Sequence, residues 1–463
     1  MLEALSSDHV SSIANRLTIA RSVRGLTQHE AAERAGLSQP QVSRIERGEV
    51  ADPSFTDVYS LANALGISLR SLASANSDRL LTELVSGEQQ GEEGPFIGMS
   101  TFNNAPVWAR KLTTPHGPQH LSIIGATGSG KTYAAKLEMI RARAMGHPVT
   151  VLDFAGEYSS LVTRMGGTVV RPGEIDCADT QAFLNPLEPF SRQITLAQQT
   201  KLAVEWLGLL LWPTEEKRYL QEALSEALYR LYTERGETND SYMQCNGKTT
   251  PTLSDLSVAV ENFCASGFAS EVKKELLETI RPYIKGGVNA GIFDGGESYA
   301  LQEELVAIDL SALSKDIREP LALLAARRVV EAGAEGKSRL LIIADETALV
   351  RAPTAFDWLS ATFELAGGRN VALTLTSQDL RFFVTKGGKS LLDYFHSALL
   401  LMQYRPADGS VVQKFFPSLS ATEIVMLSHV SFGDGLLVRD DGHGRVLLRG
   451  AATAEEGKLL ASK

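Results

Sequence analysis

The sequence predicts a mostly parallel α/β sheet that is interrupted by a block of helices and preceded by a small all-α unit. Three observations lead to this prediction. Short apolar runs typical of buried parallel strands recur between 120 and 403, leucines at helical spacing occupy the middle of the chain, and helix-capping patterns occur near its start. The chain has 463 residues, 44% of them hydrophobic, which is enough for two or three domains.

A glycine-rich loop between a predicted strand, 120–124, and a predicted helix, 133–145, is the most informative motif. It consists of Gly125, Ala126, Thr127, Gly128, Ser129, Gly130, Lys131 and Thr132. This G-x-x-x-x-G-K-[ST] pattern is typical of loops that hold nucleotide phosphates with backbone N–H groups at a helix N-terminus. Lys131 is expected to neutralise the β- and γ-phosphates, and Thr132 to ligate Mg²⁺. The fold class predicted is that of the P-loop NTPases (RecA-like), with ATP and Mg²⁺ as cofactors.

A second motif supports the first. The apolar run 339–344 ends in two carboxylates, Asp345 and Glu346. Parallel strands present their carboxyl ends to the ligand side of such a sheet, so both carboxylates are expected to face the phosphates. Asp345 would hold the Mg²⁺ hydration shell, and Glu346 would polarise the attacking water.

Charge and hydropathy disfavour several classes of protein. A net charge of −10 argues against coating nucleic acid by bulk attraction, so any DNA contact is expected to be local. Cys177, Cys245 and Cys264 lack the spacing of a zinc site or a disulfide framework. No apolar stretch approaches the ~20 residues of a membrane span, and the start lacks the pattern of a secretory signal. A cytoplasmic protein without a membrane span is therefore expected.

The first 75 residues predict a helix-turn-helix. Thr27 and Ser38 are natural N-caps for helices at 27–35 and 38–47, and Gly36 supplies the turn between them. The residues expected to pack the two helices together are Ala31, Ala32, Ala35, Leu37, Val42 and Ile45. Further helices are expected at 13–24, 54–65 and 68–73.

From Leu26 to Gly48 this pattern resembles the phage-repressor (Cro/cI, or XRE) family of DNA-binding proteins. The resemblance implies that Gln28 touches phosphate. It also implies that four residues of the second motif helix face the major groove, namely Gln39, Gln41, Ser43 and Arg44. Residues 1–75 contain seven arginines, no lysine and eight acidic residues, a net charge of −1. Protein docking by the same fold therefore stays open as an alternative.

The rest of the chain divides into three predicted parts. Residues 76–95 are polar and acidic, which indicates a flexible linker. Residues 96–463 form the predicted ATPase, with a helical insertion at about 190–285. Leu220, Leu224, Leu228 and Leu231 are spaced as the core stripe of a helix at 214–235. Strands are expected at 149–154, 305–310, 340–345, 371–377 and 398–403, followed by a terminal hairpin at 435–449.

From 96 onward the chain resembles the HerA/FtsK branch of P-loop ATPases, specifically the ATPase domain of conjugation and type IV secretion motors. The matching motifs are the phosphate loop, 152–158 (LDFAGEY), Asp345 with Glu346, and 376–378 (TSQ), with a softer match at 183–187 (FLNPL). The resemblance implies that Gln378 senses the γ-phosphate and that Glu157 helps to order the metal-bound water. Alternatively, Gln378 is a polar strand end and Glu157 a solvated turn residue.

The same resemblance implies a ring in which each nucleotide site is completed by an arginine of the neighbouring subunit. Arg369 is the candidate, although its spacing to Gln378 is shorter than the family's, and Arg381 and Arg405 are rivals. We expect a hexameric, ATP-dependent motor that acts on duplex DNA and is recruited or regulated by its helix-turn-helix. One alternative is an ATP-switched DNA-binding regulator. Another is an ATPase scaffold of a mobile-element or defence complex with an effector such as a nuclease.

Overall fold

The computed structural model describes most of the chain. It covers residues 14, 17–18, 20–21, 26–49, 55–65, 95–100, 106–108, 112, 114, 117–174, 181–191, 193–212, 217–237, 243, 250–263, 270–299, 301, 303–333, 337–344, 353–378, 380–383, 390–402, 406–417, 419–439, 445–450 and 452–461. The chain folds as two compact units. The first comprises Met1–Thr114, Gln119–Gly146 and Phe395–Lys463, and the second comprises Pro115–Pro118 and His147–Tyr394.

The N-terminal helices begin at strong capping sequences. Helix α2 (Gln28–Ala35) begins at a capping box in which Thr27 and Glu30 bond each other's backbone, and α3 (Gln39–Glu46) begins at an equivalent box of Ser38 and Gln41. Gly36 ends α2 with a φ of 67°, a left-handed conformation that favours glycine. Helix α4 (Phe55–Ala64) follows. The helices predicted at 27–35, 38–47 and 54–65 are thus confirmed to within a residue or two.

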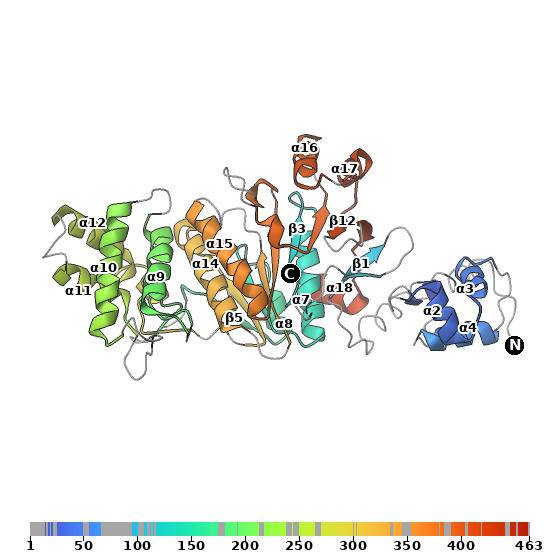
Figure 1. Ribbon diagram of the computed structural model, residues 1–463, viewed down its shortest axis with the longest axis horizontal. Helices are drawn as coiled ribbons and strands as arrows, with labels where there is room; N and C mark the ends of the chain where they lie inside the picture. The colour runs from blue at the N-terminus through green and yellow to red at the C-terminus, as the bar shows by residue number, and fades with distance from the viewer. Residues whose placement is uncertain are drawn as a thin grey trace. The chain divides into compact units, whose positions relative to one another are not determined.

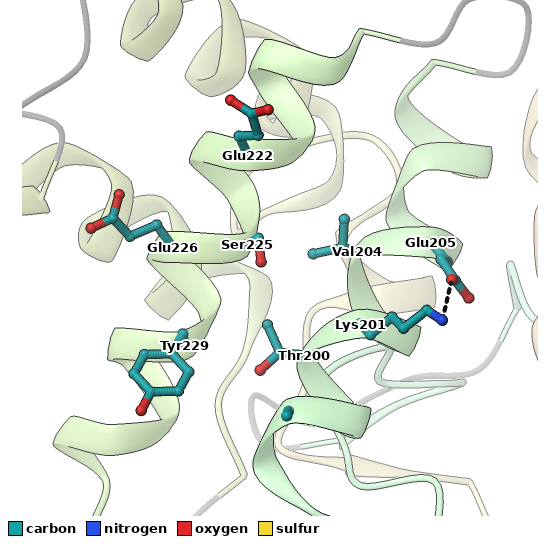
Figure 2. A pocket seen from close by; sticks show the side chains of 9 residues that line it. Thr200, Lys201, Val204, Glu205, Glu222, Ser225, Glu226 and Tyr229 are labelled. Carbon is teal, nitrogen blue, oxygen red and sulfur yellow. Dashed lines mark ion pairs between the residues drawn. The ribbon is translucent and has the colours of Figure 1, made fainter. Parts of the chain in front are cut away.

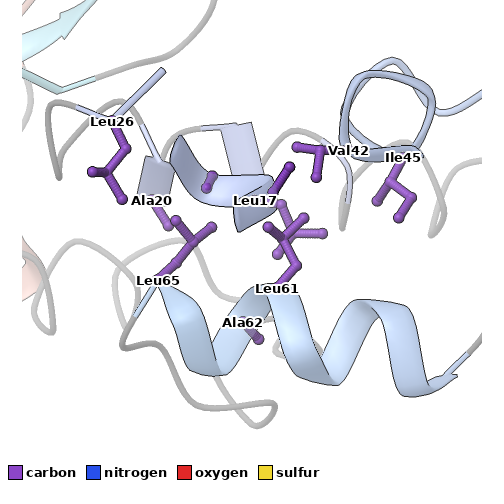
Figure 3. Close-up of a cluster of buried hydrophobic side chains, with 10 residues drawn as sticks. Leu17, Ala20, Leu26, Val42, Ile45, Leu61, Ala62 and Leu65 are labelled. Carbon is purple, nitrogen blue, oxygen red and sulfur yellow. The ribbon is translucent and has the colours of Figure 1, made fainter. Parts of the chain in front are cut away.

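These helices enclose their own hydrophobic core. Figure 3 shows Leu17, Val42 and Leu61 converging between the helices, with Ile45 and Leu65 beside them. All six residues predicted to pack the two motif helices lie in this cluster or against it. The predicted helices at 13–24 and 68–73 fall largely or wholly outside the described residues.

The first unit also contains six strands of a mixed sheet, in the order β2-β1-β13-β12-β11-β3. Its elements are β1 (Phe96–Ser100), β2 (Pro106–Trp108), β3 (Leu121–Ile124), α7 (Lys131–Ala144), β11 (Ser397–Leu401), α16 (Pro406–Phe415), α17 (Ala421–Leu427), β12 (Asp434–Arg439), β13 (Arg445–Arg449) and α18 (Ala454–Ala461). Strand β3 runs parallel to β11, with Leu121 opposite Ser397, whereas β11, β12 and β13 are antiparallel. The predicted hairpin is confirmed, and its strand β13 pairs with β1.

The second unit contains an entirely parallel run of strands in the order β10-β9-β4-β8-β5. Its elements are β4 (Val149–Asp153), α8 (Ser159–Arg164), β5 (Thr168–Val170), β8 (Leu305–Asp309), α14 (Lys315–Ala332), β9 (Arg339–Ala344), α15 (Pro353–Gly368), β10 (Val371–Ser377), η2 (Leu380–Phe383) and η3 (Leu392–Tyr394). Every residue of β4, β8, β9 and β10 is buried, as expected of strands covered on both faces. The predicted parallel strands are confirmed.

A block of helices interrupts this unit between β5 and β8 (Figure 1). Its elements are β6 (Gln181–Ala182), α9 (Leu196–Leu211), α10 (Arg218–Glu234), α11 (Leu253–Phe263), α12 (Ser270–Ile280), η1 (Arg281–Tyr283), α13 (Ala290–Phe293) and β7 (Glu297–Ser298). The four predicted stripe leucines of α10 are buried, which confirms them as core. None of the helices in the described part of the chain combines the length and the apolar content that a membrane crossing requires.

The FLNPL segment at 183–187 anchors this block. Asn185 is fully buried, and its Nδ2 donates to the carbonyl oxygens of Pro251 (2.9 Å) and Gly296 (3.4 Å). The guanidinium of Arg328 on α14 donates to the Asn185 carbonyl (2.9 Å) and lies 4.2 Å from the centre of the Phe190 ring. These contacts join the segment to α14 and to the loops at 251 and 296, so the motif has a structural role in positioning the helical block.

A buried ion pair fastens the helix that follows the phosphate loop. Arg141 of α7 and Glu456 of α18 form two hydrogen bonds, of 2.7 and 2.9 Å, and both side chains are almost completely buried. Arg141 also donates to the Phe96 carbonyl (2.6 Å), and its guanidinium lies 4.5 Å from the centre of the Phe96 ring. Burial opposes ionisation of Glu456, but the hydrogen bonds and charge of Arg141 outweigh it and lower the pKa of Glu456.

The Glu456→Gln variant should lose about 3–5 kcal/mol of unfolding free energy at pH 7, because it leaves the Arg141 charge buried without a counter-ion. The pKa of Glu456 is lowered in the folded state, so its contribution is complete above its unfolded value and is lost as the pH falls through its folded value. The difference between wild type and variant should therefore shrink below pH 4.5. Denaturant unfolding at a series of pH values measures both quantities.

Glu278→Gln is the matched control. Glu278 pairs with Lys274 at 3.8 Å on the surface of α12, where both side chains are mostly exposed. Such a pair contributes about 0.5 kcal/mol, so this variant should unfold almost as wild type does. Equal stabilities of the two variants at pH 7 would contradict the structural role given to the buried pair.

Candidate functional site

Glycines shape the loop between β3 and α7. Gly128 and Gly130 have φ values of 77° and 103°, a region that side chains strain. A Cβ atom on Gly130 would lie 2.9 Å from the backbone nitrogen of Gly433, and one on Gly125 would lie 2.4 Å from Ser129 Oγ. Neither glycine can therefore be replaced without moving its neighbours. The backbone N–H of Ala126 donates to the Met402 carbonyl (2.9 Å), which ties the loop to the end of β11.

Lys131 is the first residue of α7 and is buried in the loop. Its Nζ donates to the carbonyl oxygens of Gly125 (2.9 Å) and Ala126 (3.1 Å), and its exposed fraction is 8%. Gly130 is the N-cap of α7, so no capping side chain covers the first turn of the helix. The positive end of the helix and the lysine charge coincide at this loop, which is the arrangement that anions favour.

The loop passes a second test as a phosphate site. Ser129 is fully buried, and its Oγ has no hydrogen-bond partner within the part of the chain that the structure describes. An orphaned buried hydroxyl costs free energy unless a bound group satisfies it. The lysine, the helix N-terminus and this hydroxyl are donors suited to phosphate oxygens. Thr132, the predicted Mg²⁺ ligand of the loop, follows in the first turn of α7 and is half-buried.

The predicted acidic residues are only partly described. Asp345 and Glu346 directly follow β9, but both lie outside the described residues. Gln378 directly follows β10 and is half-buried. Strands β9 and β10 are parallel neighbours, with Ile343 opposite Leu375, so both motifs follow the carboxyl ends of adjacent strands. The roles of these three side chains stay predictions.

Asp153 organises the turn that follows β4, a role that sequence reasoning missed. Its Oδ1 accepts the N–H groups of Ala155 (3.3 Å), Gly156 (2.9 Å) and Glu157 (3.1 Å), and its Oδ2 accepts that of Tyr158 (2.8 Å). Burial raises the pKa of Asp153, while these backbone hydrogen bonds oppose the rise. The signal in the sequence was an acid at the end of an apolar run, followed by a glycine three residues later.

Glu157 projects from this turn, and its side chain is exposed. Opposite Asp153 in the strand register lies Asp309, the last residue of β8. Asp309 accepts hydrogen bonds from Ser159 Oγ (2.9 Å) and Ser311 Oγ (2.6 Å). The buried acids therefore hold turns at the carboxyl ends of β4 and β8, and Glu157 is left facing outward as a candidate to order water.

The candidate arginines differ in their surroundings. Arg369 follows α15, and its Nη2 lies 3.2 Å from Oε2 of Glu331 on α14, which also pairs with Arg327. Arg369 would have to leave this ion pair to reach a neighbouring subunit. Arg381 is exposed in η2, and Arg405 lies outside the described residues. The assignment of the trans-acting arginine stays a prediction.

Two of the candidate DNA-contacting residues of the helix-turn-helix, Gln28 and Gln39, are joined by a hydrogen bond. Glu46 accepts two hydrogen bonds from Arg21 (2.6 and 3.0 Å) and one from Gln28 Nε2 (2.9 Å). Gln28 Oε1 in turn accepts from Gln39 Nε2 (2.9 Å). This chain of contacts holds Gln28 and Gln39 together on one surface.

The other candidate residues are placed differently. Gln41 is exposed, but its Oε1 accepts from the N–H (2.9 Å) and the Oγ (2.7 Å) of Ser38 in the capping box. Ser43 is half-buried, and its carbonyl accepts from Arg47 Nε (3.2 Å). Arg44 is exposed on the last turn of α3. Arg44 and Gln39 are thus exposed side chains of α3, whereas Gln41 also serves the cap.

A cavity of about 660 Å³ lies between α9 and α10, within the helical block (Figure 2). Three carboxylates, Glu205, Glu222 and Glu226, line it together with Lys201. Lys201 lies 3.7 Å from Glu205, and burial raises the pKa of Glu205 while Lys201 opposes the rise. This acidic lining disfavours a polyphosphate, so the glycine-rich loop is the better candidate for a phosphate site.

Comparison with known protein families gives two matches. Residues 24–72 match the helix-turn-helix family model, and residues 118–285 match the model of the central domain of helicase HerA. The uncharacterized HTH-type transcriptional regulator y4dJ of Sinorhizobium fredii is 46% identical over 48 residues, which are 10% of this chain and 61% of that relative. The chain therefore spans about three fifths of this curated relative.

Two of the solved structures that are similar to this chain show the shared fold. VirB4 of Thermoanaerobacter pseudethanolicus superposes with a TM-score of 0.66 at 19% identity, covering 79% of this chain and 99% of VirB4. A bacterial conjugative coupling protein, TrwBdeltaN70 in complex with sulphate, has a TM-score of 0.51 at 13% identity. The match covers 79% of this chain and 91% of TrwBdeltaN70. The chain joins a helix-turn-helix to a HerA-like P-loop domain, and the resemblance expected from the sequence is confirmed.

Asp153→Asn should lower the free energy of unfolding by about 1–3 kcal/mol, because the amide NH₂ cannot accept the backbone N–H groups that a carboxylate oxygen accepts. Chemical denaturation measures the change. Glu157→Gln is the matched control in the same turn, since its side chain is exposed, and it should change stability by less than about 0.5 kcal/mol. If Asp153→Asn unfolds at the wild-type midpoint, the turn does not depend on this carboxylate.

Proposed function

We propose that this protein is a Mg²⁺-dependent ATPase that acts on duplex DNA as a ring-forming, hexameric motor recruited or regulated by its helix-turn-helix. The phosphate loop carries the proposal, because Lys131, the uncapped first turn of α7 and the buried Ser129 hydroxyl meet in one glycine-shaped loop. The HerA central-domain match and the VirB4 fold support the motor. The helix-turn-helix match supports DNA as the partner.

The proposed domains are a DNA-binding domain at 1–75, a linker at 76–95 and an ATPase at 96–463 with a helical insertion at about 190–285. Lys131 would bind the β- and γ-phosphates, and the backbone of 125–132 would orient them. Thr132 and Asp345 would hold Mg²⁺, which when bound neutralises phosphate charge. Glu346 would accept a proton from the attacking water, Glu157 would help to order that water, and Gln378 would contact the γ-phosphate.

An ATP-switched regulator is the second candidate function, because the matched N-terminal segment is also that of an HTH-type transcriptional regulator. In that case ATP binding would alter DNA affinity without translocation. The two functions differ in their response to DNA: a motor hydrolyses ATP faster on DNA, whereas a switched regulator does not require hydrolysis. A third alternative is an ATPase scaffold for an effector such as a nuclease. Co-purification of such an enzyme with this protein would favour that alternative.

Lys131→Ala should abolish ATP hydrolysis and weaken nucleotide binding, because it removes the positive charge of the phosphate loop. Phosphate release is measured with and without duplex DNA, and wild-type turnover should rise on DNA. Glu278→Gln, on the surface of α12, is the control that should hydrolyse ATP normally. Wild-type turnover by Lys131→Ala would rule out the phosphate loop as the site. Particle images with an ATP analogue and duplex DNA test the hexameric ring.

The double variant Gln39→Ala/Arg44→Ala should bind preferred DNA more weakly, since each lost base contact is worth about 1–3 kcal/mol. Affinity is measured on duplexes enriched by the wild-type protein from a random library, at a stated salt concentration. Arg34→Ala, an exposed arginine on α2 outside the proposed reading residues, is the control. Unchanged enrichment and affinity in the double variant would favour protein docking by this domain.

A further inference from the structure

The turn before β12 packs directly against the phosphate loop. The backbone N–H of Gly433 donates to the Ser129 carbonyl (3.1 Å), and the Gly433 carbonyl accepts from the N–H of Gly450 (3.1 Å). Gly433 has a φ of 77°, and its backbone nitrogen leaves no room for a side chain on Gly130. Backbone hydrogen bonds on both sides therefore hold this turn in a defined position beside the loop.

Phe432 immediately precedes this glycine and is 63% exposed. Its ring centre lies 5.9 Å from that of Tyr133, with 59° between the ring planes. A Cβ atom on Gly130 would lie 3.7 Å from Phe432 Cε2, so the ring borders the phosphate loop as well. Such exposure leaves apolar ring surface in water, which a flat ligand would favourably cover.

Tyr133 is the residue after Thr132 and lies in the first turn of α7. A tyrosine side chain is neutral at physiological pH, and burial raises the pKa of Tyr133 further. A nucleotide whose phosphates occupy 125–132 must place its nucleoside close to one flank of this loop. The flank at Phe432 and Tyr133 offers aromatic surface, which matches the π-face of a base.

We propose that Phe432, supported by Tyr133, forms the stacking surface for the base of the bound nucleotide. This inference rests on the proposed ATP site and extends it to the nucleoside. An aromatic surface contacts the π-face that all bases share and does not hydrogen-bond their edges. Phe432 therefore contributes affinity for the base without distinguishing adenine from guanine, and selectivity between ATP and GTP does not come from this surface.

Calorimetric titrations of the full-length protein with Mg·ADP, Mg·GDP and magnesium pyrophosphate test the proposal. Phe432→Ala should bind ADP and GDP about 30-fold more weakly, the middle of the range for lost base–aromatic stacking, and should bind pyrophosphate as wild type does. Phe432→Trp should restore the affinity for both nucleotides. Val425→Ala is the matched control, since Val425 is a 58% exposed apolar residue of α17 in the same unit, and it should bind all three ligands normally.

Several results would overturn the proposal. Unchanged ADP affinity in Phe432→Ala would show that Phe432 does not contact the base. An equal loss for ADP and pyrophosphate would show that the substitution distorts the phosphate loop. Normal ADP affinity combined with lost DNA stimulation of turnover would assign Phe432 to a DNA contact. If wild type binds neither ADP nor pyrophosphate, the ATP site itself fails, which is distinct from a failure confined to Phe432.

Discussion

The close backbone approach between Gly130 and Gly433 is the constraint around which the first unit is built. The phosphate loop can adopt its shape only if another segment satisfies the Ser129 carbonyl and leaves space for its positive-φ glycines. The turn at 432–433 does both, because Gly433 presents a backbone N–H and carries no side chain. A segment some 300 residues away in the sequence thereby becomes part of the loop.

The elements behind the loop maintain this approach. Strand β12 continues from Gly433 and pairs with β11, which in turn pairs with β3, the strand that enters the loop. On the other side, the Arg141–Glu456 pair fixes α18 to the helix that leaves the loop. Breaking a buried pair costs far more than breaking one in water, since the remaining charge stays desolvated. Both ends of the phosphate loop are therefore held by C-terminal segments.

Carboxylates have divided roles in the second unit. The parallel strands β4 and β8 end in the buried acids Asp153 and Asp309. Asp153 accepts hydrogen bonds from backbone N–H groups, and Asp309 accepts them from serine hydroxyls. Rigid turns at the carboxyl ends of strands hold neighbouring side chains in place, which a catalytic arrangement requires. In the helix-turn-helix, Gln39 donates a hydrogen bond to Gln28, and Gln28 donates one to Glu46. Two side chains that are candidates for DNA contact are therefore held in place by their neighbours.

Local chemistry alone determined much of this protein. The capping boxes at Thr27 and Ser38, the glycine-rich loop, the apolar strands and the leucine stripe of α10 could all be predicted, since each depends on neighbours within a few residues. Helix α14 was not predicted, because it is buried nearly all round and lacks the 3.6-residue apolar period. Only the tertiary structure decided that β1 pairs with β13, that Arg141 meets Glu456 and that Phe432 borders the phosphate loop. These contacts join segments separated by hundreds of residues. No local pattern encodes which distant residue will neutralise a buried charge or which distant backbone will pack against a glycine.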